Sequence, residues 1–183
     1  MATVAHPRLA PDEFVALESS VGWQLALELI HGEAVVIPPT GGHAASIQGE
    51  LFFALRTWQE RVGDRGLLLQ DVFVALPGGH FLAPDIAWWH DERRPRVGDG
   101  AVDVVPDLVV EVLSPATRLN DLGAKRELYV TAGVRELWLA DPTDASIIRV
   151  TAEATGGDAR THGTFAGGLL DRLEIDLTRV FAR

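Results

Sequence analysis

The stretch that decides the fold runs from Leu108 to Asp141 and reads LVVEVLSPATRLNDLGAKRELYVTAGVRELWLAD. A strand is expected over Asp107–Ser114, and its apolar run Leu108–Leu113 predicts that the strand is covered on both faces. A helix is expected over Asn120–Ala132, where Gly133 suits the left-handed C-terminal cap, and a second strand over Glu136–Asp141. A strand, a crossover helix and a second strand of this length predict a parallel pair with a right-handed connection.

Further elements are expected on both sides of this stretch. Upstream, the pattern predicts a short helix over Pro11–Ser20, a hairpin of Leu25–Ile30 and Glu33–Ile37, a long helix over His43–Val62, and strands over Gly66–Leu76 and Phe81–Trp89. Downstream, it predicts a strand over Ile147–Ala152, then a weakly patterned segment that adds a strand and a short helix. The result is a mixed α/β fold: an N-terminal hairpin, then helix, three strands, helix, strand, with helices flanking a mixed sheet. No repeat or linker divides the chain, so one domain is expected over residues 1–183.

The composition limits the classes of function. The chain has no cysteine, which excludes thiolate catalysis and zinc–thiolate sites. No apolar run approaches the roughly 20 residues that span a bilayer. Residues 1–11 lack the pattern of a secretory signal, so a cytoplasmic protein with no membrane partner is expected. The net charge of −10 argues against a broad basic surface that grips nucleic acid, though not against a local arginine-lined groove.

Two carboxylates stand in apolar surroundings on neighbouring predicted strands. Glu111 is the only charged residue in the run Leu108–Leu113, and Asp85 lies between Pro84 and Ile86. A buried charge is costly unless it is paired or bound to a metal. Two such carboxylates repel each other, and oxygen ligands of this kind favour Mg²⁺ or Mn²⁺. The alternative for Glu111 is a structural ion pair with a buried arginine.

Asp107 is a rival candidate on the same strand as Glu111. It lies four residues from Glu111, about 13 Å away at roughly 3.3 Å per residue. One ion cannot bridge that gap. Asp107 is therefore interpreted as the residue that begins the strand after Pro106.

Lys125 is the only lysine in the chain, whereas all other basic residues, histidines aside, are arginines. Such an exception suggests a site that needs a compact ammonium, although chance is the alternative. Lys125 lies about 7–8 Å along the predicted helix, and Glu111 lies about 10 Å back from the strand end. The two come level. Asp121, Lys125 and Tyr129 share one helix face because they are spaced by four residues.

A divalent cation, two carboxylates and a lysine are the parts of a metal-dependent phosphodiesterase. The cation would polarise the phosphoryl group and lower the pKa of a bound water. The lysine would position or activate that water and offset charge on the phosphate.

These motifs resemble the Uma2 family, formerly a domain of unknown function, with a restriction-endonuclease-like fold of the PD-(D/E)xK superfamily. The resemblance covers the chain from about Phe14 to Arg149. It rests on Pro84-Asp85, on Pro106-Asp-Leu-Val-Val-Glu-Val-Leu-Ser-Pro115, on Asp121, Lys125 and Tyr129, and on Gly133-Val-Arg-Glu-Leu-Trp-Leu-Ala-Asp-Pro142, with Leu29-Ile-His-Gly-Glu33 and His43 added.

The resemblance implies that Asp85 and Glu111 are metal ligands, with the Val112 carbonyl as the third. Leu113 stands where the superfamily places a lysine after the acidic residue, and Lys125 from the following helix replaces it. Four residues are supporting candidates, and three of them have a second interpretation. Tyr129 orients Lys125 or is structural, Asp121 accompanies Lys125 on its face, His43 contacts the site or only sits at a helix start, and Glu50 adds a carboxylate or is solvent-exposed.

The first function that follows is a Mg²⁺- or Mn²⁺-dependent endonuclease that hydrolyses phosphodiester bonds in nucleic acid, with DNA as the expected partner. Cutting both strands would favour a homodimer. The alternatives are a non-catalytic nucleic-acid-binding or regulatory module, which the acidic charge favours, and a hydrolase of a small nucleotide or phosphodiester.

Overall fold

The structure is a computed structural model that describes residues 8–21, 26–63, 65–151, 159–166 and 168–182. The expected strand ends at Leu25 and Ala152 lie outside the described residues, as do residues 1–7 of the N-terminus. Within the described part of the chain, no helix is long and apolar enough to cross a membrane.

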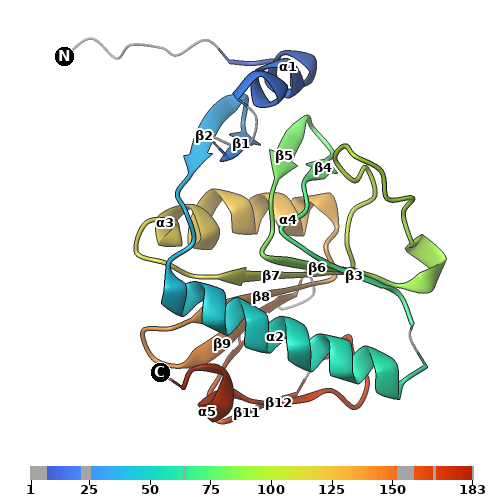
Figure 1. Cartoon of the computed structure of the whole chain (residues 1–183), viewed down its shortest axis with the longest axis vertical. Helices are drawn as coiled ribbons and strands as arrows, with labels where there is room; N and C mark the ends of the chain where they lie inside the picture. The colour runs from blue at the N-terminus through green and yellow to red at the C-terminus, as the bar shows by residue number, and fades with distance from the viewer. Residues whose placement is uncertain (1–7, 22–25, 64, 152–158, 167, 183) are drawn as a thin grey trace.

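A six-stranded mixed sheet forms the centre of the molecule, in the order β10-β9-β8-β7-β6-β3 (Figure 1). Strands β7 and β8 run parallel, whereas every other neighbouring pair in this sheet is antiparallel. The predicted parallel pair and mixed sheet are therefore confirmed. The strands are β3 (Leu67–Gln70), β6 (Ile86–Trp89), β7 (Leu108–Val112), β8 (Glu136–Asp141), β9 (Ser146–Thr151) and β10 (Ala159–Thr161).

A second, four-stranded sheet has the order β2-β1-β5-β4 and includes the predicted hairpin. His31 and Gly32 both have positive φ, of 52° and 81°. This conformation matches the twist of a two-residue hairpin turn. The strands are β1 (Ala26–Ile30), β2 (Glu33–Ile37), β4 (Val74–Leu76) and β5 (His80–Leu82), and a separate two-stranded sheet pairs β11 (Thr164–Ala166) with β12 (Glu174–Asp176).

Two segments that were each expected to form one continuous strand are divided into two strands. The strand expected over Gly66–Leu76 breaks near Asp71, whose φ is +50°, and the one over Phe81–Trp89 breaks at Pro84. Proline has no N–H for a ladder hydrogen bond, and a left-handed residue turns the chain out of the strand. The second half of one strand and the first half of the next consequently belong to the four-stranded sheet.

The helices lie on both faces of the six-stranded sheet. In Figure 1, α2 crosses one face and α4 lies on the other. The prediction of one regular α-helix over Asn120–Ala132 is wrong, because the five residues Asp121–Lys125 are π-helical and only Arg126–Ala132 continue as an α-helix. The helical segments are α1 (Pro11–Val21), α2 (Gly42–Arg61), η2 (Asp91–Arg93), α3 (Arg118–Asn120), η3 (Asp121–Lys125), α4 (Arg126–Ala132) and α5 (Leu177–Val180).

Alternating residues of the central sheet feed two separate cores. Val110 and Trp138 pack with α2 on one face, whereas Val109 and Leu137 pack with α4 on the other. Side chains two apart along a strand share a face. Glu111 therefore lies on the α4 face with Val109.

Candidate active site

Asp85 lies in the break between β5 and β6, directly after Pro84. Its carboxylate accepts a hydrogen bond from the Val112 N–H (N to Oδ2, 2.5 Å). Its backbone carbonyl accepts the side-chain amide of Gln48 at 3.0 Å and the N–H of Asp71 at 3.2 Å. Burial raises the pKa of Asp85 to about 6, although the hydrogen bond from Val112 opposes the shift. The break in the strand thus holds one carboxylate against the end of β7.

Glu111 is buried within β7, with 3% of its surface exposed. Its Oε1 accepts the Tyr129 hydroxyl at 2.7 Å and contacts the Lys125 Nζ at 2.8 Å. Burial raises the pKa of Glu111 well above its usual value, and the carboxylates of Asp85 and Asp121 add to the shift. The alternative, a structural ion pair between Glu111 and a buried arginine, is wrong, because the partners of Glu111 are Lys125 and Tyr129.

Lys125 closes the π-helical segment η3, in which Gly123 departs from helical geometry. A π turn adds one residue to the hydrogen-bonded ring, so it shifts the side chains that follow relative to a regular helix. The Nζ lies 2.8 Å from Glu111, 3.0 Å from Glu28 and 3.4 Å from Asp121. Burial alone would lower the pKa of Lys125, but the three carboxylates outweigh it and raise the pKa above the ordinary value. The ammonium therefore stays charged.

Tyr129 and Asp121 both belong to this group. Tyr129 is fully buried, and its hydroxyl is directed to Glu111 rather than to Lys125. Burial and the charge of Glu111 raise its pKa well above the usual value, so it remains a hydrogen-bond donor. Asp121 is 2% exposed, and its Oδ1 accepts no hydrogen bond from a described residue; the Lys125 ammonium 3.4 Å away is the charge beside it.

Glu28 is a member of the group that sequence reasoning missed. It comes from β1, in the four-stranded sheet, and is 4% exposed. It stands alone as a charge in Leu27-Glu28-Leu29-Ile30, which is the same signal that singled out Glu111. Gln48 was also missed: its amide joins Asp71 (2.8 Å) to the backbone of Asp85.

A cavity of about 280 Å³ opens onto this group. Asp85, Glu111, Asp121 and Lys125 line it together with Val112. Most of its other wall residues come from the segment 37–41, at the end of β2 and before α2, and from the loop 114–117 after β7. The charged side chains are buried within the fold yet border a space that a small group can enter.

The donor chemistry of this cavity suits a hard divalent cation. Asp85 and Glu111 offer carboxylate oxygens, and Asp121 has a buried oxygen to which no described residue donates a hydrogen bond. The N–H and C=O of one strand residue face the same neighbouring strand, so Val112 would offer its carbonyl on the side of Asp85. Among the described residues, no three His, Cys, Asp or Glu side chains are arranged as a ready-made metal cage. A site built from two carboxylates and a carbonyl is consistent with that finding.

The remaining candidates lie outside the carboxylate–lysine group. His43, the second residue of α2, lines a neighbouring cavity with Ser114 and Arg118. Glu50 pairs with Arg179 at 3.4 Å and is not brought to the site. Asp107 lies directly before β7, is fully buried, and accepts hydrogen bonds from Arg93 and the His90 N–H.

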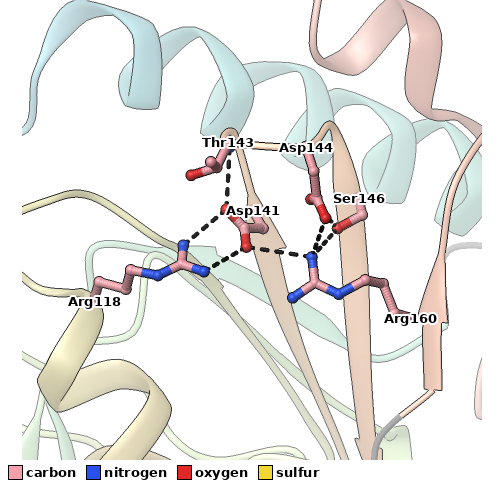
Figure 2. Close-up of polar contacts among 6 residues, drawn as sticks. All are labelled: Arg118, Asp141, Thr143, Asp144, Ser146 and Arg160. Atoms are coloured by element: carbon pink, nitrogen blue, oxygen red, sulfur yellow. Dashed lines mark hydrogen bonds and ion pairs between the residues drawn. The ribbon is translucent and has the colours of Figure 1, made fainter.

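An ion-pair network connects Arg118 of α3, the segment just before η3, to the end of β8. Figure 2 shows Asp141, at the end of β8, between two arginines. Arg118 binds both of its carboxylate oxygens at 2.8 Å, and Arg160 lies 3.3 Å from one of them. The Arg118 hydrogen bonds are the largest cause that lowers the pKa of Asp141, and hydrogen bonds from Thr143 add to the shift. The network fixes the start of the segment that carries Asp121 and Lys125.

Comparison with known proteins points to one family. A family model described as "Uma2: Putative restriction endonuclease" matches residues 11–178. A crystal structure of a "putative nuclease belonging to DUF820" from Anabaena variabilis superposes with a TM-score of 0.79 at 20% identity. The match covers 95% of this chain and 98% of that one. No curated protein matches the chain. The expected family and the restriction-endonuclease-like fold are therefore confirmed.

Proposed function

The chain belongs to the Uma2 family of restriction-endonuclease-like proteins, and on that premise we propose that it is a divalent-metal-dependent endonuclease acting on nucleic acid, with DNA as the first substrate to test. The observation that carries this proposal is the convergence of Asp85, Glu111 and Lys125 on one cavity. Fold alone does not determine activity. The chemistry of these three residues is what supports a phosphodiesterase.

In this proposal, Asp85, Glu111 and the Val112 carbonyl hold Mg²⁺ or Mn²⁺. When bound, such an ion polarises a phosphoryl oxygen and lowers the pKa of a water molecule that it binds. The protein contributes position: Asp85 is fixed by the N–H of Val112, and Glu111 by the hydroxyl of Tyr129. Ligands held this way need little reorganisation when the substrate arrives.

Lys125 would offset the negative charge that develops on the phosphate. Its ammonium lies among Glu28, Glu111 and Asp121, which keep it protonated. A protonated lysine cannot accept a proton from water. Lys125 is therefore assigned an electrostatic role rather than the role of general base.

A hydrolase of small phosphodiesters is the second candidate. Two observations favour it: the chain carries a net charge of −10, and the cavity of about 280 Å³ is of a size that suits a small ligand. A long polyanion would meet repulsion from such a surface. The two candidates share the proposed catalytic residues and differ only in the substrate.

The test combines metal binding with cleavage. Mn²⁺ is titrated calorimetrically into the wild type, Asp85→Asn and the control Glu50→Gln, which removes a surface carboxylate paired with Arg179. The same proteins are assayed on plasmid DNA, on an RNA oligonucleotide and on bis(p-nitrophenyl) phosphate. We expect wild type and control to bind Mn²⁺ and cleave, and Asp85→Asn to do neither.

Each outcome decides between the candidates. Cleavage of DNA in both strands, with a dimer in sedimentation, supports an endonuclease that works as two copies. Cleavage of the small diester alone supports the second candidate. Folded wild type that binds no Mn²⁺ would contradict both.

A further inference from the structure

Glu28 makes one carboxylate oxygen serve two parts of the candidate site. Its Oε1 accepts the N–H of Ala83 at 2.9 Å and contacts the Lys125 Nζ at 3.0 Å. Ala83 lies two residues before Asp85, across Pro84. The same atom therefore touches the backbone that delivers Asp85 and the ammonium of Lys125.

We propose that Glu28 is a positioning residue that holds the Lys125 ammonium at the site and fixes the Ala83–Asp85 segment, without being a metal ligand. This inference rests on the proposed function, because it assigns Glu28 a part in that reaction. Glu28 touches neither the substrate nor the metal in this proposal. It acts through Lys125 and through the backbone before Asp85.

Charge explains why a second anchor is needed. In the structure, Lys125 shares Glu111 with Tyr129. A divalent cation on Glu111 would repel the nearby ammonium, since like charges at this range oppose each other. Glu28 at 3.0 Å and Asp121 at 3.4 Å are the carboxylates that remain beside Lys125 when Glu111 binds a cation, and Glu28 is the nearer of the two.

The hairpin gives Glu28 a rigid support for this task. Leu27 and Leu29, on either side, are buried against Phe14 of α1. Side chains alternate along a strand, so anchoring these two leucines on one face directs Glu28 to the other. The four-stranded sheet thus contributes the Glu28 carboxylate to the site beside the six-stranded sheet.

The experiment compares Glu28→Gln with Glu33→Gln. The amide oxygen that Glu28→Gln introduces can still accept the Ala83 N–H, so this change removes mainly the charge. Glu33 lies in the same hairpin but is exposed, and it serves as the matched control. We expect Glu28→Gln to lower kcat by about 10- to 100-fold, as misplacement of a catalytic group does, with KM and Mn²⁺ affinity unchanged. The control should match the wild type in all three.

A second readout does not depend on activity. Because Lys125 is the only lysine, reaction of its side-chain amine with an acylating reagent can be followed at one peptide by mass spectrometry. We expect this reaction to be slow in the wild type and in Glu33→Gln, and several-fold faster in Glu28→Gln. Glu28→Asp, which keeps the charge but withdraws it from Lys125, should also react faster and serves if Glu28→Gln does not fold.

The outcomes separate this inference from the proposed function. Equal lysine reactivity in wild type and both Glu28 variants would overturn it, as would loss of Mn²⁺ binding in Glu28→Gln, because the retained amide oxygen should keep the Ala83–Asp85 segment in place. If the wild type cleaves no substrate, the proposed function fails. The lysine reactivity still decides whether Glu28 holds Lys125.

Discussion

The hydroxyl of Tyr129 donates a 2.7 Å hydrogen bond to Glu111 Oε1, the same oxygen that meets the Lys125 ammonium at 2.8 Å. One carboxylate oxygen thus receives two donors from two consecutive segments, Lys125 of η3 and Tyr129 of α4. Tyr129 is the only tyrosine in the chain and Lys125 the only lysine. Both uncommon residues are used on a single acceptor atom.

Tyr129→Phe should destabilise the protein by about 1–3 kcal/mol, because a buried carboxylate loses a donor while the ring stays in place. Urea unfolding measures this change. The lysine reactivity should change little, since Glu28 and Asp121 still flank the ammonium. A variant as stable as the wild type would show that the hydrogen bond contributes nothing.

Lys125→Met should cost about 3–5 kcal/mol at neutral pH, because it leaves buried carboxylates without their cation. Burial and neighbouring carboxylates already raise the pKa of Glu111 with the lysine present. A raised pKa in the folded state means that stability is lost as pH rises. The loss of unfolding free energy in Lys125→Met, relative to the wild type, should therefore be smaller at pH 5 than at pH 8.

The control for this change is Arg96→Met, which removes a positive charge that is exposed to solvent instead of buried. Its stability relative to the wild type should be nearly the same at both pH values. Urea unfolding at pH 5 and pH 8 gives the comparison. A flat pH response of Lys125→Met would contradict the burial of three carboxylates around that lysine.

Asp141→Asn should reduce stability by about 1.5–3 kcal/mol, the range for hydrogen bonds to charged groups. Arg118 lowers the pKa of Asp141 in the folded state. A lowered folded-state pKa gives stability that is complete above the ordinary value near 3.8 and is lost as pH falls below it. The difference between wild type and Asp141→Asn should therefore shrink in acid. Thermal unfolding between pH 7 and pH 3 tests this, with the exposed Asp103→Asn as a control.

Gly66→Ala should destabilise the protein more than Gly63→Ala does. Gly66 has φ of +83°, and a Cβ there would overlap the carbonyl oxygen of Trp89 and the indole of Trp88. Overpacking of this kind costs about 1–3 kcal/mol beyond backbone strain. Gly63, at φ of +90° with open space around it, is the matched control, because Gly63→Ala incurs the strain alone. Equal urea midpoints for the two variants would refute the overlap.

Much of the site could be predicted because its signals are local. A single charge inside an apolar strand identified Glu111, and a single lysine at helical spacing from Asp121 and Tyr129 identified Lys125. Glu28 carried the same local signal as Glu111 but lies in a different sheet. Its approach to Lys125 depends on how the two sheets meet, and no spacing within the sequence encodes that distance.

The breaks in regular structure were harder to foresee. Pro84 was visible, yet the strand around it was expected to continue, because apolar residues stand on both sides. The π-helical segment over Asp121–Lys125 depends on a departure at Gly123 that helical periodicity does not register. Both irregularities lie at the proposed catalytic residues.

The residues of the proposed centre are scattered from β1 to η3, across about half the chain. Contacts between such distant segments form late in folding, because closing long loops costs entropy before any contact compensates for it. A nascent or partly folded chain would hold single carboxylates but no assembled centre. Any hydrolytic activity of the proposed centre would therefore arise only once the fold is complete.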